Sequence, residues 1–258
     1  MRLQIASDLH LEFPENVEYI KKNPLKVTGE ILLLAGDVMP LKLIDKHQDF
    51  FSFIADNYQQ TYWVPGNHEY YNFDMANRTG AFSEAIRPNV TLLNNTSIRL
   101  KNSRLHFTTL WSNIGASNAW YIERGLMDFH AIRFEGQRLS AQQYNRMHAG
   151  CVAYLHSCFD KMPGSNEGEK NIIITHHVPT FLNYPAEYAG SPLNDAFATN
   201  LDHLITAFDA DYWVYGHNHA GTGHFTLGKT QLVTNQLGYV RHREHGAFNT
   251  ARVISLDE

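Results

Sequence analysis

Short runs of apolar residues recur along the chain, and each one ends in a polar or glycine-containing loop. These runs lie at 2–7, 30–35, 61–64, 171–175 and 211–215. Runs that are apolar at nearly every position are typical of strands covered on both faces, as in parallel sheets packed by helices. We therefore predict a buried strand at each of these places.

Between these runs, apolar residues recur at the spacing of an amphipathic helix. The stretches 41–58, 140–159 and 200–208 have this pattern. Ser140 is followed three residues later by Gln143, which is the arrangement of a capping box at a helix N-terminus. Strand, loop and helix in alternation predict an α/β fold.

Three stretches depart from this alternation. Residues 90–110 and 223–256 read as consecutive strands, so we expect mixed sheets. Residues 111–138 fit neither helix nor strand and are rich in Trp, Asn and Gly. Long loops inside compact domains are usually functional, so we interpret 111–138 as a lid or substrate-binding insertion with a short helix.

The aromatic residues of this insertion have two interpretations. Trp120, Tyr121 and Phe129 either pack the loop against the domain or face a substrate. Packing is the simpler interpretation, and the sequence leaves the choice open.

Composition and charge narrow the class of protein. The chain has 258 residues, 43% of them hydrophobic and 18% charged, with a formal net charge of −5. This length suits one domain with a sizeable core, and we see no boundary within 1–258. Proteins that coat nucleic acid usually carry a basic excess, so nucleic acid is not the expected partner.

The sequence has no run of 18 apolar residues, so no membrane span is expected, and its start lacks the apolar stretch of a signal peptide. Cys151 and Cys158 lie seven positions apart in a predicted helix, about 10 Å along its axis. A disulfide requires Cα atoms within about 7 Å, so these thiols should stay free. We expect a cytoplasmic protein.

Polar side chains capable of binding metals follow each of the predicted buried strands. They are Asp8 and His10, Asp37, Asn67 and His68, His176 and His177, and His217 and His219. Each set alone is common in ordinary turns and caps. In open α/β sheets, however, ligands bind beyond the carboxyl ends of the strands, and crowded carboxylates and imidazoles there require a positive partner because unpaired buried charge is costly.

The donor types indicate metal ions. Carboxylate, imidazole and amide ligands suit Zn, Mn, Fe or Co, and the lack of thiolates argues against a structural zinc site. The number of donors suits two ions, and a pair of ions about 3.5–4 Å apart clamps a phosphoryl group for in-line displacement.

The order of these motifs resembles the calcineurin-like metallophosphoesterase superfamily. The matching pieces are "SDLH", "AGDV", "PGNHE", "THHVP" and "YGHNH", which extend from residue 5 to residue 220, and "TNQLGY" adds a weaker match. The resemblance implies a four-layer α-β-β-α sandwich with two mixed β-sheets and a binuclear metal site at the strand C-terminal ends.

The resemblance also implies roles for individual residues. The first metal would be held by Asp8, His10 and His219, the second by Asn67, His176 and His217, and Asp37 would bridge them. His68 would be a catalytic, non-ligand histidine that protonates the leaving group, and His177 a supporting or substrate-facing residue. Gly216 would let the backbone turn toward the ions, with Asn218 facing away.

The expected reaction is hydrolysis of a small-molecule phosphoester by a metal-bridging hydroxide, with Mn, Fe or Zn as the metals. We expect phosphodiesters to be preferred. A monoester carries almost two negative charges near pH 7, and arginine meets such charge best, yet the five motif loops contain neither arginine nor lysine. An inward turn of Arg124, Arg133 or Arg138 would reverse this preference.

Three alternatives remain. The first is a phosphomonoesterase or nucleotide phosphatase, although "GDVMP" lacks the arginine-containing signature of serine/threonine protein phosphatases. The second is a nuclease, which is supported by local basic clusters such as that of Arg241, His242, Arg243 and His245. The third is a metal-binding scaffold that has lost catalysis. Such a protein would lack some of the metal ligands, and none of the expected ligands is missing. The sequence does not indicate an oligomeric state.

Overall fold

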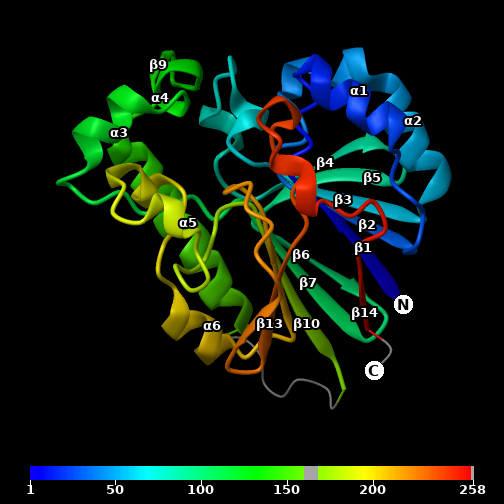
Figure 1. Ribbon diagram of the computed structural model, residues 1–258. Helices are drawn as coiled ribbons and strands as arrows, with labels where there is room; N and C mark the ends of the chain where they lie inside the picture. Colours follow the sequence, from blue (N-terminus) through cyan, green and yellow to red (C-terminus); the bar gives the residue numbers. More distant parts are fainter. Residues whose placement is uncertain (160–167, 257–258) are drawn as a thin grey trace.

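The computed structural model describes residues 1–159 and 168–256, which form two six-stranded sheets lying face to face (Figure 1). The first sheet has the order β14 (Val253–Ser255), β1 (Arg2–Ala6), β2 (Ile31–Ala35), β3 (Gln60–Val64), β5 (Val90–Asn94) and β4 (Phe82–Arg87). Its four central strands are parallel, and both edge strands are antiparallel to their neighbours.

The second sheet repeats this plan. Its order is β12 (Phe225–Leu227), β13 (Thr230–Thr234), β11 (Tyr212–Tyr215), β10 (Lys170–Thr175), β7 (Ser103–Thr108) and β6 (Thr96–Leu100). Again the central strands are parallel and the edges antiparallel. The expectation of two mixed sheets is therefore confirmed.

Helices cover the outer face of each sheet (Figure 1). The first sheet is covered by α1 (Pro14–Lys22) and α2 (Gln48–Asn57), and the second by α5 (Ala141–Phe159) and α6 (Asp202–Phe208). Cys151 and Cys158, both in α5, have free thiols, as expected. The reciprocal bonds of Ser140 and Gln143 at the start of α5 confirm the capping box: Ser140 N–H donates to Gln143 Oε1 and Gln143 N–H to Ser140 Oγ.

Three apolar layers explain the continuous apolar runs in the sequence. Leu33 of β2 lies in the layer between the sheets, whereas its neighbours Leu32 and Leu34 pack toward α1 and α2. In the second sheet, Ile174 faces the inner layer and Ile173 faces α5. Both faces of each central strand are covered, so most positions of these strands are apolar and the few polar ones, such as Gln4, are buried too. The layers are the four of an α-β-β-α sandwich.

Several elements differ from the prediction. The stretch 41–58 is divided into a 3-10 helix, η1 (Leu41–His47), and the regular helix α2. Helix α1 and the edge strand β4 were not predicted. Segment 223–256 is only partly strand, because the 3-10 turns η6 (Val240–His242) and η7 (Glu244–Ala247) separate β13 from β14. Gly238, with a φ of +66°, lies between the end of β13 and these turns.

The insertion 111–138 contains more structure than a long loop with one short helix. It forms α3 (Ala119–Gly125), α4 (Asp128–Ala131) and a small hairpin of β8 (Arg133–Phe134) and β9 (Gln137–Arg138). Phe129 is buried against Tyr144 of α5, so it packs the insertion onto the domain. In contrast, Trp120 and Tyr121 are more than half exposed. Within the described residues, no helix combines the length and apolarity needed to cross a membrane.

Candidate metal centre

The two sheets bring the five motif loops to one place. Strands β1, β2 and β3 are parallel neighbours in the first sheet, and β10 and β11 are parallel neighbours in the second. Their carboxyl ends therefore lie at the same edge of each sheet, and the edges meet because the sheets face one another. All seven residues predicted as metal ligands are brought together there: Asp8, His10, Asp37, Asn67, His176, His217 and His219.

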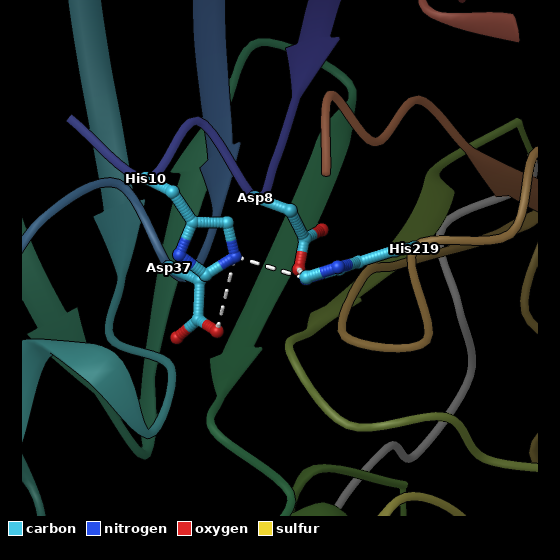
Figure 2. Close-up of side chains that lie close together, drawn as sticks. All are labelled: Asp8, His10, Asp37 and His219. Carbon is cyan, nitrogen blue, oxygen red and sulfur yellow. Dashed lines mark hydrogen bonds and ion pairs between the residues drawn. The ribbon is translucent and has the colours of Figure 1, made fainter. Parts of the chain in front are cut away.

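One group of donors contains Asp8, His10, Asp37 and His219, one atom from each lying within 4.8 Å of the others (Figure 2). The Nε2 atoms of His10 and His219 are 2.9 Å apart. Asp37 Oδ2 lies 3.8 Å from His10 Nε2. We call this the first group.

A second group contains Asp37, His176 and His217. The Nε2 atom of His176 lies 3.0 Å from His217 Nδ1, 3.1 Å from Asn67 Oδ1 and 3.4 Å from Asp37 Oδ1. Asp37 thus takes part in both groups and turns one carboxylate oxygen toward each. This geometry is what a bridging ligand requires.

The hydrogen bonds behind the histidines show that the groups fit metal ions. His10 Nδ1 donates to Glu12, and His219 Nδ1 donates to Glu244. Because the Nδ1 atoms carry these protons, the two Nε2 lone pairs face each other and need a cation or a proton between them. In the second group, His176 Nδ1 donates to the Ala35 carbonyl, so its Nε2 likewise faces oxygen and nitrogen lone pairs.

The pKa values express the same electrostatics. Burial lowers the pKa of His219, but its bonds with Asp8 and Glu244 outweigh burial and raise it to about 10. Burial also opposes protonation of His176, yet the Asp37 carboxylate raises its pKa to about 9. Asp8 Oδ2 is buried and has no hydrogen-bond partner among the described residues. A proton or a metal ion therefore satisfies the lone pairs of each group.

The backbone of these loops is strained at the donors themselves. Asp8, His10, Asp37, His217 and His219 all have positive φ values, between 47° and 80°. Non-glycine residues rarely adopt this conformation, and such strain concentrates at functional sites.

Gly216 plays a different part from the one expected. It is absent from the positive-φ positions, and the turn is made instead by His217, whose φ is 80°. A Cβ atom at position 216 would lie 2.6 Å from Asp8 Oδ2 and 3.0 Å from the Ala35 carbonyl oxygen. Glycine is needed here because the strand end passes close to Asp8, not because the chain turns at it.

A buried glutamate ties two of the loops together. Glu69 accepts hydrogen bonds from the backbone N–H groups of Asp37, Val38 and Gly66 and from Trp63 Nε1. Burial and the nearby Asp37 carboxylate raise the pKa of Glu69 to about 8. The sequence showed Glu69 only as part of a motif, whereas the structure shows that it holds the loops after β2 and β3 in register.

His68 lies beside both groups and is held by a second glutamate. It begins the 3-10 turn η2 (His68–Tyr70), its ring stacks on Tyr71 with centroids 4.0 Å apart, and Nδ1 donates to Glu12 Oε1 over 2.7 Å. Its Nε2 lies 3.9 Å from Asp37 Oδ2. Burial lowers its pKa, but Asp37 and Glu12 outweigh burial and raise it. The His68 ring is therefore held with its Nε2 toward the shared Asp37 carboxylate.

Asp128, from α4 of the insertion, holds the amide of Asn67. Its Oδ1 accepts hydrogen bonds from Asn67 Nδ2 at 2.9 Å and from the Tyr71 hydroxyl at 2.7 Å. Because the amide nitrogen is engaged in this way, Asn67 Oδ1 faces His176. Sixty-one positions separate the two residues in the chain, and no sequence pattern connects them.

The remaining candidates are also placed. His177 is fully buried, its Nε2 lies 2.8 Å from the Tyr144 hydroxyl, and its ring packs on His217, so it supports the second group and does not face a substrate. Asn218 Oδ1 accepts a hydrogen bond from Gln236. Tyr239, from the weaker "TNQLGY" match, packs its ring on those of His10 and His219.

A cavity of about 290 Å³ opens over both groups. Its floor includes Asp37, Asn67, His68, His217 and His219. Its walls are Leu126 and Asp128 of the insertion, Tyr239 and Glu244 of the C-terminal segment, and residues of 184–197, which contains η4 (Ala186–Tyr188) and η5 (Pro192–Ala196). The segment 184–197 was not predicted as part of the site, and its only signal in the sequence is its position shortly after a metal-binding motif.

None of the three arginines of the insertion lines this cavity. Arg124 stacks on the ring of Trp120. Arg124 and Arg138 line a separate hollow beside Phe129, and Arg133 is exposed. Nor do Trp120 and Tyr121 line the cavity over the candidate metal groups.

The fold and the site together define a class of protein: a two-sheet α/β sandwich with two groups of metal-binding donors sharing one carboxylate. The family model of the calcineurin-like phosphoesterases matches residues 1–221. A protein of Acanthamoeba polyphaga mimivirus, named uncharacterized protein L509, is 30% identical over 284 residues, covering 99% of this chain and 97% of the relative.

A solved structure shares the fold. Phosphopantetheinyl hydrolase from Mycobacterium tuberculosis is similar with a TM-score of 0.71 and 15% identity over 98% of this chain and 95% of the other. A dimetal phosphatase from Danio rerio gives a TM-score of 0.40 and 16% identity, over 92% and 87% of the two chains.

The chain belongs to the calcineurin-like phosphoesterase family and is a phosphoester hydrolase. The family uses a centre of two metal ions, and the two groups described above are able to bind them.

Proposed function

We propose that this protein is a phosphodiesterase that uses two metal ions, Mn, Fe or Zn, at the two groups. Asp8, His10 and His219 would hold the first ion, Asn67, His176 and His217 would hold the second, and Asp37 would be shared by both. Nitrogen and oxygen donors without thiolates support these metals. When bound, such a pair supplies an activated water and polarises the phosphoryl oxygens.

The residues of the chain supply orientation and a proton. His68 is fixed by Glu12 and by stacking on Tyr71, with Nε2 toward the shared carboxylate. It is the residue best placed to protonate the departing oxygen, a contribution of about 10²–10⁴-fold. Asp128 keeps the Asn67 oxygen turned toward His176.

The charge of the cavity supports a diester substrate over a monoester. Two carboxylates that are not in the donor groups, Asp128 and Glu244, line it, and no lysine or arginine does so among the described residues. A monoester near pH 7 carries almost two negative charges, which arginine meets best. A diester carries one charge and a second substituent, for which the walls offer apolar and aromatic surface.

The test compares kcat/KM for bis(p-nitrophenyl) phosphate and p-nitrophenyl phosphate at the same pH with the same metal. We expect an advantage for the diester of at least about tenfold. A phosphopantetheinyl diester belongs among further substrates, because the M. tuberculosis protein of similar fold is named for that activity. A clear advantage for the monoester would assign the chain to the phosphomonoesterases or nucleotide phosphatases instead.

We further infer that the protein works in a reducing compartment such as the cytoplasm. The support is that Cys151 and Cys158 are both free thiols. Recovery of the protein from an oxidising compartment of its own cells would contradict this inference.

A further inference from the structure

The outer part of the cavity is a wall of aromatic rings. Tyr184, Tyr188, Phe197 and Tyr239 line it. The rings of Tyr184 and Tyr188 both line the cavity, with their centroids 6.3 Å apart and their planes inclined at 60°. The ring of Tyr239 contacts those of His10 and His219 in the first group. The aromatic wall is therefore directly adjacent to the candidate metal centre.

A carboxylate lies among these rings. Glu244 lines the same cavity, and its Oε2 accepts hydrogen bonds from His219 Nδ1 and from the Tyr239 backbone N–H, each at 2.7 Å. Its other oxygen, Oε1, has no hydrogen bond within the described part of the chain. Tyr188 and Glu244 line the same cavity.

The aromatic rings and the Glu244 carboxylate together favour a ligand group that carries a positive charge. Ring faces attract cations through their quadrupole, and quaternary ammonium ligands are bound in this way. A neutral apolar group at this wall would displace water from the Glu244 carboxylate without offering it a hydrogen bond or a positive charge instead, and such desolvation is costly. An anionic group would meet Glu244 and Asp128 with no lysine or arginine to offset them among the described lining residues.

We propose that the cavity takes an alcohol carrying an alkylammonium group, bound as the second substituent of the phosphodiester. This inference rests on the proposed function, because it assigns the scissile phosphate to the floor and the ammonium group to the wall. A volume of about 290 Å³ lies at the low end of ligand pockets, so the alcohol is a small one. Choline is the simplest probe of this chemistry.

The first experiment measures binding, so it does not depend on turnover. Choline and 3,3-dimethyl-1-butanol have the same shape, but carbon replaces the charged nitrogen in the second. We expect the metal-loaded protein to bind choline about tenfold more tightly in an NMR titration. Equal affinities would overturn the inference.

Two variants locate the ammonium group. Tyr188→Leu keeps apolar volume but removes a ring face, so the ratio of the two affinities should fall about threefold or more. Glu187→Gln is the matched control, because Glu187 is an exposed carboxylate next to Tyr188 that does not line the cavity. An equal fall in the control would show a diffuse charge effect and overturn the assignment to the wall.

The second experiment compares p-nitrophenyl phosphocholine with p-nitrophenyl 3,3-dimethylbutyl phosphate, two diesters with the same leaving group. We expect kcat/KM to be about tenfold higher for the phosphocholine diester. Hydrolysis of both at equal rates would overturn the ammonium assignment and leave the diesterase intact. Loss of the diesterase would appear separately, as failure to cleave bis(p-nitrophenyl) phosphate by a protein that still binds choline selectively.

Discussion

The two candidate metal groups share Asp37 but are held in different ways. In the first group, carboxylate side chains orient the histidines: Glu12 behind His10 and Glu244 behind His219. In the second group, a backbone carbonyl, that of Ala35 in β2, orients His176.

Because of this difference, substitution can remove the supports of the first group but not the backbone support of His176. A carboxylate behind a ligating histidine fixes the tautomer and increases the basicity of the ring, and it can be removed by one substitution. The Ala35 carbonyl belongs to the backbone of the central strand β2, so a change of side chain does not remove it. His176 is therefore the more rigidly oriented of these histidines, and the carboxylate that supports the second group is Asp128, which holds Asn67.

The largest effect is expected where the two groups join. Asp37→Asn should weaken both groups at once, because each uses one oxygen of this carboxylate. Partners behind ligands are already worth 10–100-fold in metal affinity, so we expect the loss of a shared ligand charge to exceed about 100-fold at each group. Metal content after dialysis measures it.

His219→Ala is the control for this prediction, because His219 belongs only to the first group. It should release chiefly one metal ion per chain. If Asp37→Asn retained both ions as well as the unaltered protein does, Asp37 would not be the bridge.

The next effect is on turnover alone. His68→Ala should lower kcat by about 10²–10⁴-fold while metal content stays unchanged, because His68 is outside both the first and the second group. The loss should shrink for substrates whose leaving groups need no proton, such as p-nitrophenyl esters compared with alkyl esters. Loss of bound metal in this variant would show that His68 is a ligand.

Much of the architecture and most of the donor groups follow from the sequence, and the reason is local. Apolar runs covered on both faces mark the central strands, and donors directly after those runs must share an edge. The placement of His176 and His217 needed nothing more than this rule.

The supports behind the donors did not follow from the sequence, because they depend on distant parts of the chain. Asp128 reaches Asn67 from an insertion without a recognisable pattern, and Glu244 reaches His219 through two 3-10 turns in a segment that reads as strand. The wall segment 184–197 has no periodicity either. Tertiary contacts decide these positions, and they decide substrate specificity as well.

A pair of matched substitutions sharpens the comparison of the supports. Glu244→Gln should weaken metal binding at the first group, and Asp128→Asn at the second, each by about 10–100-fold. Tyr71→Phe, which removes the second hydrogen bond to Asp128 and a long 3.4 Å bond from Asn67 Nδ2, should have a smaller effect than Asp128→Asn, because the bond between Asp128 and Asn67 stays. Calorimetric titration of both sites measures these affinities, and identical losses at both groups in either variant would contradict the separate supports.

The smallest effect is a pH dependence of metal binding that differs from that of an ordinary histidine site. The pKa values of His176 and His219 are raised to about 9 and about 10 from 6.5, so the metal-free protein holds protons at both groups near neutral pH. Metal ions bind the deprotonated rings and must displace these protons. Affinity should therefore rise with pH, by about tenfold per unit for each proton released, until the pH reaches about 9.

The sign can be checked on stability. A raised pKa stabilises the metal-free fold fully below pH 6.5 and loses this contribution as the pH rises through the raised value. In the metal-bound fold the rings of His176 and His219 carry no such protons, as in the unfolded chain above pH 6.5, so its stability does not change over this interval. The increase in Tm on adding metal should therefore grow from pH 6.5 to pH 9, because the metal-free fold becomes less stable. His10 and His217 have lowered pKa values and should release no proton there. A Tm increase that is flat between pH 6.5 and pH 9 would mean that the rings are neutral before metal binds, and that the close approach of His10 and His219 is not maintained by a proton.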